Sequence, residues 1–121
     1  MMKVFMFQPR FAPLVASFAK RQTIRPPRVR PPAINEMLSL RAWTGRPYHS
    51  KQRILLDPVR CTRVWPITIS SFGLSMDAAT LSCLSTLNQF ARADGFADWQ
   101  DMIAWFNSEH GLPFHGILIQ W

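Results

Sequence analysis

Short segments of apolar or alternating residues predict strands in the first 72 positions and at the end of the given sequence. Successive side chains of a strand point to opposite faces, so alternation indicates a half-buried strand and a short apolar run a buried one. Met37, Leu38, Leu40 and Ala42 give MLSLRAW this character. Pro66 predicts an edge or a bulge, because proline cannot donate to a neighbouring strand. The segments predicted as strands are 3–7, 37–43, 54–56, 60–72 and 113–121.

Helical spacing of apolar residues predicts three helices. Asp98 is a suitable N-cap for the best of them, and Gly111 suits the position just past its end. Gly95 similarly marks the end of the helix before it. The predicted helices are 10–18, 84–93 and the segment between Asp98 and Gly111.

The remaining segments predict loops and set the fold class. Residues 44–53 are polar and contain Gly45 and Pro47, and four prolines keep residues 26–32 extended or turning. No repeat is visible, and 121 residues suit one domain spanning 1–121. The element order predicts an α+β fold, a small curled mixed sheet or barrel with helices at its sides.

The composition indicates a packed, basic protein. Hydrophobic residues make up 48% of the chain, which excludes a disordered protein. The net charge is +7, and residues 1–63 carry 13 of the 14 basic residues, for a net +11 against −4 in the rest. Such an imbalance favours anionic partners such as nucleic acid or nucleotides. The alternative is that the charge only maintains solubility.

Cysteine and histidine, the residues that form disulfides or bind metals, are few in this sequence. Cys61 and Cys83 lie in separate segments without metal-ligand spacing, and three scattered histidines do not complete a site. We expect two reduced, packed thiols, no metal and no cofactor. No apolar run approaches the roughly 20 residues that span a membrane. The prediction is a cytoplasmic protein without a membrane partner.

Lys20 and Thr23 are the best local candidates for chemistry. A lysine whose pKa is lowered by burial could deprotonate a threonine hydroxyl or activate a water. Residues three apart in an extended segment point to opposite faces, so their convergence requires a bend. The alternative is that Lys20 is a surface cation and Thr23 an ordinary strand residue.

Several segments together resemble the ASCH-domain family. They are PRF…LVASFAKRQTIR, LSLRAW, CTRV and FARADGFADWQDMIAWF, followed by FHGILIQW, and they extend from about residue 4 to residue 121. The most specific element is K-x-x-T-I-R at 20–25, and the second is the carboxylate before Gly-Phe in RADGF. The segment LRAWTGRPYHSKQR is similar to small ASCH proteins of phage and prophage origin. The resemblance implies a PUA-like fold.

The resemblance also implies an activity. Some small bacterial ASCH proteins are amidohydrolases that remove the acyl group from N4-acetylcytidine with a lysine, a threonine and a glutamate. The matching positions here are Lys20, Thr23 and Asp94, which would act on N4-acetylcytidine or a related N4-acylated cytosine nucleoside. In this interpretation Thr23 positions the nucleophile or water, Lys20 moves the proton, and Asp94 orients Lys20.

Four further residues are candidates for substrate binding in this interpretation. Arg10 and Arg25 would line the mouth of the site and attract anionic ligands. Trp43 and Tyr48 could stack on a base, as aromatic side chains do with unpaired nucleobases. The alternatives are core packing for Trp43 and a loop anchor for Tyr48.

The chain departs from the family pattern at three places. Asp94 is one methylene shorter than glutamate, so the same contact requires a backbone that lies about 1 Å closer, a distance that matters for catalysis. Phe18 stands where the family has a glycine, which would allow a positive φ. Asn35 and Glu36 replace a Gly-Asp pair.

The alternative function is an RNA-binding module, with or without ribonuclease activity. Arg21, Arg28 and Arg30 would then line a basic cleft. The uneven charge favours this alternative, because a nucleoside is neutral. Asp94 favours the hydrolase, because RNA binding alone does not require an acid in an anion cleft.

Overall fold

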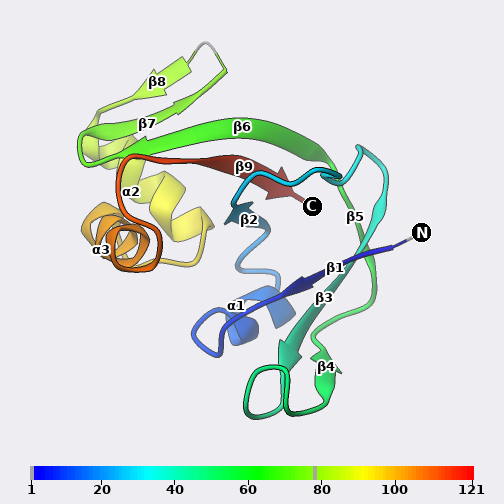
Figure 1. Cartoon of the computed structure of the whole chain (residues 1–121). Helices are drawn as coiled ribbons and strands as arrows, with labels where there is room; N and C mark the ends of the chain where they lie inside the picture. Colours follow the sequence, from blue (N-terminus) through cyan, green and yellow to red (C-terminus); the bar gives the residue numbers. More distant parts are fainter. Residues whose placement is uncertain (1, 78) are drawn as a thin grey trace.

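The structure, a computed structural model, describes residues 2–77 and 79–121. Nine strands and three helices form in these ranges (Figure 1). The strands make two sheets that are not closed. The predicted α+β class is therefore confirmed, whereas the predicted barrel is not shown.

The first sheet is built around one long strand. β3 (Met37–Trp43) pairs in parallel with β1 (Lys3–Met6) and in antiparallel fashion with β4 (Gln52–Ile54) and β5 (Val59–Arg60). The sheet is therefore mixed, as predicted.

The second sheet is antiparallel throughout. Its order is β2 (Gln22–Arg25), β9 (Phe114–Gln120), β6 (Arg63–Ser70), β7 (Gly73–Met76) and β8 (Ala79–Leu81). β2 forms where only an extended segment was predicted, and β7 and β8 were not predicted. Pro66 pairs with β9, while pairing with β7 begins at Ile67, so this proline has a neighbour on one side only.

One helix connects the two sheets, and the other two lie between strands of the second sheet. α1 (Ala12–Ala16) connects β1 to β2, and α2 (Leu84–Ala93) and α3 (Trp99–Glu109) lie together before β9 (Figure 1). Asp98 is the N-cap of α3 and accepts a hydrogen bond from Asp101 N at 2.8 Å, as predicted. None of the helices in the described ranges has the length and apolar character needed to cross a bilayer.

The core draws on both sheets and all three helices. Val15, Leu38, Ile69, Met102 and Ile119 are completely buried. Cys61 is also buried, but Cys83 is exposed just before α2, so the expectation of two packed thiols is wrong for Cys83. Cys83 is the N-cap residue of α2, and at this position its side chain does not pack into the core.

Two positions that depart from the family pattern adopt left-handed backbone conformations. Phe18, which follows the end of α1, has φ of 65°, and Asn35 has φ of 74°. Asparagine tolerates this region, but a phenylalanine there is strained. The turn expected of a glycine is thus present although the residue is Phe18.

Replacing this residue should relieve the strain. Phe18→Gly should raise the free energy of unfolding by about 1 kcal/mol, because the left-handed conformation costs other residues roughly 1–2 kcal/mol. The side chain of Phe18 is half exposed, so little packing is lost. Urea denaturation would measure the change. Phe18→Ala keeps the strain and should give no gain, whereas a Phe18→Gly protein no more stable than wild type would contradict the explanation.

Candidate functional site

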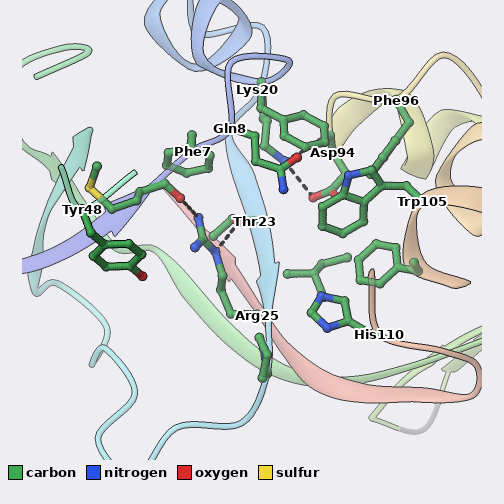
Figure 2. Close-up of a pocket in the computed structure, with 15 residues that line it drawn as sticks. Phe7, Gln8, Lys20, Thr23, Arg25, Tyr48, Asp94, Phe96, Trp105 and His110 are labelled. Atoms are coloured by element: carbon green, nitrogen blue, oxygen red, sulfur yellow. Dashed lines mark hydrogen bonds and ion pairs between the residues drawn. The ribbon is translucent and has the colours of Figure 1, made fainter. Parts of the chain in front are cut away.

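One pocket brings the predicted catalytic residues together. It has a volume of about 290 Å³ and lies where the end of β1, the start of α1 and β2 face the α2–α3 region (Figure 2). Lys20, Thr23, Asp94, Arg25 and Tyr48 all line it. We call it the inner pocket. Its other lining residues are Met6, Phe7, Gln8, Phe11, Ile24, Pro26, Phe96, Trp105, Phe106 and His110.

A buried ion pair lies in the inner pocket. Lys20 and Asp94 are 3% and 2% exposed, and Lys20 Nζ lies 3.3 Å from Asp94 Oδ1. The ammonium also donates to the main-chain carbonyl oxygen of Asp94 and lies 5.0 Å from the centre of the Phe11 ring. Lys20 is therefore not a surface cation, and the shorter aspartate side chain still reaches it.

The end of α2 explains how an aspartate makes this contact. Phe96 N donates to Ala91 O, and Gly95 N donates to Arg92 O, the two bonds of a Schellman motif. Gly95 has φ of 97°, and a Cβ there would lie 3.0 Å from Lys20 Cδ. The absence of a side chain at Gly95 lets the α2 backbone approach Lys20 closely, which offsets the missing methylene of Asp94.

The bend that Lys20 and Thr23 require lies between α1 and β2. Phe18 N donates to Val15 O and Lys20 N donates to Leu14 O, so the chain turns sharply before β2 begins at Gln22. Lys20 precedes the strand and Thr23 lies within it, and both line the inner pocket. The ammonium of Lys20 donates to Asp94 and not to Thr23.

Thr23 is instead hydrogen-bonded to Arg25. Arg25 Nε donates to Thr23 Oγ1 at 2.9 Å, and Arg25 Nη2 donates to the Met6 carbonyl oxygen at 2.8 Å (Figure 2). The guanidinium is thereby fixed between β1 and β2. A cationic donor on the oxygen of Thr23 favours its deprotonated form and leaves its O–H free to donate into the pocket.

Gln22 is a site residue that the sequence did not indicate. It is 4% exposed, donates from Nε2 to Asp94 Oδ1 at 3.3 Å, and accepts from Gln120 Nε2 at 3.1 Å. Neighbouring side chains in a strand point to opposite faces, so Gln22 does not share the face of β2 that carries Thr23. A pattern of residues on the Thr23 face therefore could not have indicated Gln22. It holds the carboxylate of Asp94 toward Lys20.

Burial shifts the proton affinities of both members of the ion pair toward their neutral forms. Desolvation lowers the pKa of Lys20, while the charge of Asp94 and its hydrogen bond oppose the shift. Desolvation raises the pKa of Asp94, while Lys20 and Gln22 oppose it. The proton of Lys20 is therefore easier to transfer than that of an exposed lysine.

Aromatic side chains form the walls of the inner pocket. Trp105 lies 5.7 Å from both Phe11 and Phe96, centroid to centroid, and His110 lies 5.8 Å from Trp105. His110 is the C-cap of α3. Trp105 lies within α3 and His110 at its end, and no motif in the sequence indicated that these side chains line a pocket.

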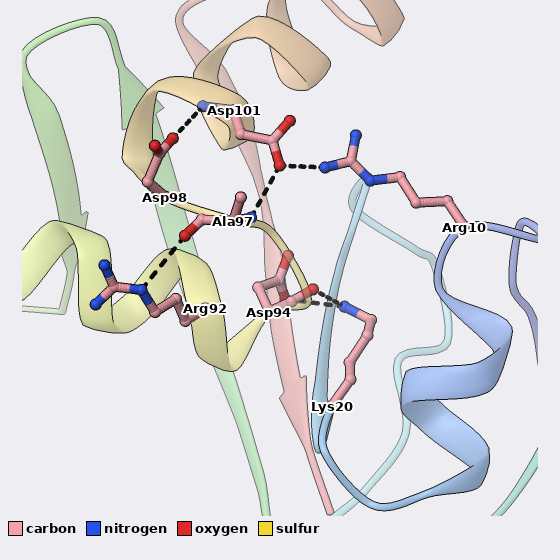
Figure 3. A network of polar contacts seen from close by, with 7 residues as sticks. All are labelled: Arg10, Lys20, Arg92, Asp94, Ala97, Asp98 and Asp101. Carbon is pink, nitrogen blue, oxygen red and sulfur yellow. Dashed lines mark hydrogen bonds and ion pairs between the residues drawn. The ribbon is translucent and has the colours of Figure 1, made fainter.

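Arg10 and Trp43 do not line the inner pocket. Arg10 forms an ion pair with Asp101 and lies over the rings of Phe96 and Phe11, at 4.9 and 5.4 Å. Asp101 also accepts from Ala97 N at 2.9 Å, so this contact fixes the connection between α2 and α3 (Figure 3). Trp43 is half-buried and lies 5.1 Å from Tyr48.

The three arginines of the alternative site are exposed. Arg21 lies 5.6 Å from the ring of Phe18, and Arg28 lies 4.7 Å from the ring of Phe5. Arg30 lies in the exposed segment after β2. None of the three lines the inner pocket.

Within the described residues, no group of three or more His, Cys, Asp and Glu side chains is placed to hold a metal ion. Comparison of the chain with protein-family models, with curated proteins and with solved structures finds no match.

The close approach at Gly95 can be tested against a second glycine. Gly95→Ala should lower the free energy of unfolding by about 1 kcal/mol more than Gly111→Ala. Both residues have a positive φ, but a Cβ at Gly111 would meet nothing within 4 Å. Urea denaturation of both variants measures the difference. Equal losses would show that Lys20 and Phe11 tolerate the added methyl group.

The buried ion pair should make stability depend on pH when one partner is removed. Asp94→Asn leaves Lys20 buried without a counter-charge, which costs about 3 kcal/mol at pH 7. It also removes the charge that raises the pKa of Lys20. The folded protein therefore releases the Lys20 proton at a lower pH than the unfolded chain, in which lysine has its ordinary pKa of about 10.4. Between these values the unfolded chain binds more protons, so raising the pH from 7 to 10 should shrink the loss.

Urea denaturation at several pH values measures this dependence. Lys20→Met combined with Asp94→Asn is the control, because it contains no buried amine and should not show the recovery. An Asp94→Asn deficit that stays constant from pH 7 to 10 would contradict the proposed state of Lys20.

Proposed function

We propose that the protein is an amidohydrolase that removes the acyl group from N4-acetylcytidine or a related N4-acylated cytosine nucleoside. The observation that carries this proposal is the buried Lys20–Asp94 pair beside Thr23 in one aromatic pocket. A buried lysine is costly unless it is paired, and its lowered pKa suits a group that moves protons.

The chemistry divides among the three residues. Lys20 first passes a proton to the carboxylate of Asp94, the partner to which it is bound. A water held by the Thr23 hydroxyl then attacks the amide carbonyl carbon and transfers a proton to the amine of Lys20. The C–N bond then breaks as Lys20 returns the proton to the exocyclic nitrogen, giving a carboxylic acid and cytidine. Asp94 and Gln22 hold Lys20 in place, so that the amine cannot turn away from the substrate.

The walls of the inner pocket suit a planar base. Phe11, Trp105 and Tyr48 offer aromatic surface, and a volume of about 290 Å³ is at the lower end for small-ligand sites. Tyr48 is 85% exposed, so stacking on a base would cover a ring that is otherwise in solvent. Trp43 supports Tyr48 from behind in this arrangement.

The fold is compatible with the same proposal. We propose that the two sheets are a PUA-like, ASCH-type arrangement, in which β2 supplies the lysine and threonine and the end of α2 supplies the carboxylate. The described cysteines are both free thiols, which supports a reducing compartment such as the cytoplasm.

RNA binding is the second candidate. Exposed Arg21, Arg28 and Arg30 favour it, because each can neutralise a phosphate. It leaves the buried Lys20–Asp94 pair without a role, so it ranks second. Its signature is an affinity that falls steeply with salt, whereas turnover of a neutral nucleoside responds little to salt.

The hydrolase proposal predicts cytidine release that depends on Lys20. Purified protein incubated with N4-acetylcytidine should change its ultraviolet absorbance as cytidine forms. Lys20→Ala and Thr23→Val should each lower kcat by about a hundredfold or more, since proton transfer and nucleophile positioning contribute on this scale. Lys20→Met retains most of the side-chain volume and tests whether the loss comes from the amine alone.

Lys51→Ala is the matched control, since Lys51 is an exposed lysine outside the inner pocket. It should leave release unchanged. Unaltered release by a folded Lys20→Ala protein would overturn the catalytic assignment. No release by wild type at high protein concentration would overturn the hydrolase itself.

A further inference from the structure

A second cavity continues the inner pocket past Arg25. It has a volume of about 420 Å³ and shares Met6, Arg25, Pro26 and Tyr48 with the inner pocket. We call it the outer cavity. Its remaining lining residues are Val4, Phe5, Pro27 and Arg28. A ligand in contact with Lys20 can therefore extend past Arg25 to Arg28 while remaining within the two cavities.

Within the described residues, neither of the two guanidinium groups that face this cavity forms an ion pair. Arg25 lies 5.3 Å and Arg28 4.7 Å from the centre of the same Phe5 ring. No Asp or Glu in the described ranges lies within ion-pair distance of either arginine. Two like charges on one ring repel each other, and an anion bound between them would remove that cost.

The hydrogen bonds of Arg25 leave part of it available. Nε is used by Thr23 and Nη2 by Met6, so Nη1 has no acceptor within the described chain. Burial and, less strongly, the like charge of Arg28 lower the pKa of Arg25 to about 10, while the charge of Asp94 opposes the shift, so Arg25 remains charged at neutral pH. Arg25 is held rigidly, with a donor group left for a ligand.

The segment that carries Arg28 is stiff. Pro26 and Pro27 separate the two arginines and restrict the backbone to extended conformations. Arg28 is therefore presented at a restricted distance from Arg25. Two guanidinium groups that line one cavity suit the several oxygens of a phosphate, which accept bonds from more than one donor.

Resting on the amidohydrolase function proposed above, we infer that the outer cavity binds a phosphate group of the substrate between Arg25 and Arg28. The substrate is then an acylated cytosine nucleotide whose base enters the inner pocket, whose sugar passes Tyr48, and whose phosphate lies on the two arginines. The phosphate can belong to a mononucleotide or to a phosphodiester of RNA.

Turnover of matched substrates tests this inference. N4-acetylcytidine, its 5′- and 3′-monophosphates and a short RNA containing it should be compared by kcat/KM. At least one phosphorylated form should exceed the nucleoside about tenfold, the scale of a hydrogen bond to a charged group. Arg28→Ala should reduce this ratio about tenfold, and Arg53→Ala, an exposed arginine of β4 that lines neither cavity, should not change it.

The form that is preferred identifies the source of the phosphate. A preferred monophosphate indicates a free nucleotide, and a preferred oligonucleotide indicates RNA. Equal kcat/KM for nucleoside and all phosphorylated forms, unaffected by Arg28→Ala, would overturn the inference while leaving the hydrolase proposal intact.

A binding measurement separates the two proposals if no substrate is hydrolysed. Isothermal titration calorimetry with cytidine and cytidine 5′- and 3′-monophosphates then probes the outer cavity directly. Tighter binding of a monophosphate that is lost in Arg28→Ala supports the phosphate site although the hydrolase has failed. Indistinguishable binding of cytidine and its monophosphates, or no binding of any of them, overturns the phosphate site too.

Discussion

The buried pair of Lys20 and Asp94 is the constraint on which the rest of the site depends. Removing two charges from water is costly, and the cost is recovered only if both groups are held in good geometry with further hydrogen bonds. Gly95 lets the backbone at the end of α2 approach Lys20, and Gln22 donates a further hydrogen bond to the carboxylate of Asp94. The ring of Phe11 covers the ammonium of Lys20. Well-packed apolar residues would often be as stable as such a pair, so its presence argues for a chemical role.

The two cavities differ in the charged groups that line them: the inner pocket contains both a cation and an anion, whereas the outer cavity is lined by two arginines. At the inner end, a cation and an anion lie together, and burial disfavours the charged form of each, lowering the pKa of Lys20 and raising the pKa of Asp94. Farther out, Arg25 links the ends, because it donates to Thr23 and also faces the outer cavity. Under the proposed function, this one immobilised guanidinium joins recognition of the ligand to the chemistry at Thr23.

The sequence predicted those features that local signals determine. Gly95 and Asp98 mark the helix boundaries directly, and α2 and α3 begin and end close to where they were predicted. β7 and β8 escaped prediction because their short sequences have few β-branched residues and depend on pairing with β6 for their conformation. The Lys20–Asp94 contact followed only from the family resemblance. It depends on the left-handed turn at Phe18, which no propensity favours, and its support by Gln22 comes from the opposite face of β2.

The place of β2 at the end of its sheet has a consequence for biosynthesis. In the described chain β2 pairs only with β9, and Gln22 and Gln120 are 98 positions apart. At about 5–20 residues per second, a ribosome needs roughly 5–20 seconds to make the partner of β2 after β2 itself. Until then, the strand that carries Thr23 and Arg25 has no sheet to join. The site is therefore assembled last, and a chain whose synthesis stops early contains the lysine and threonine but no pocket.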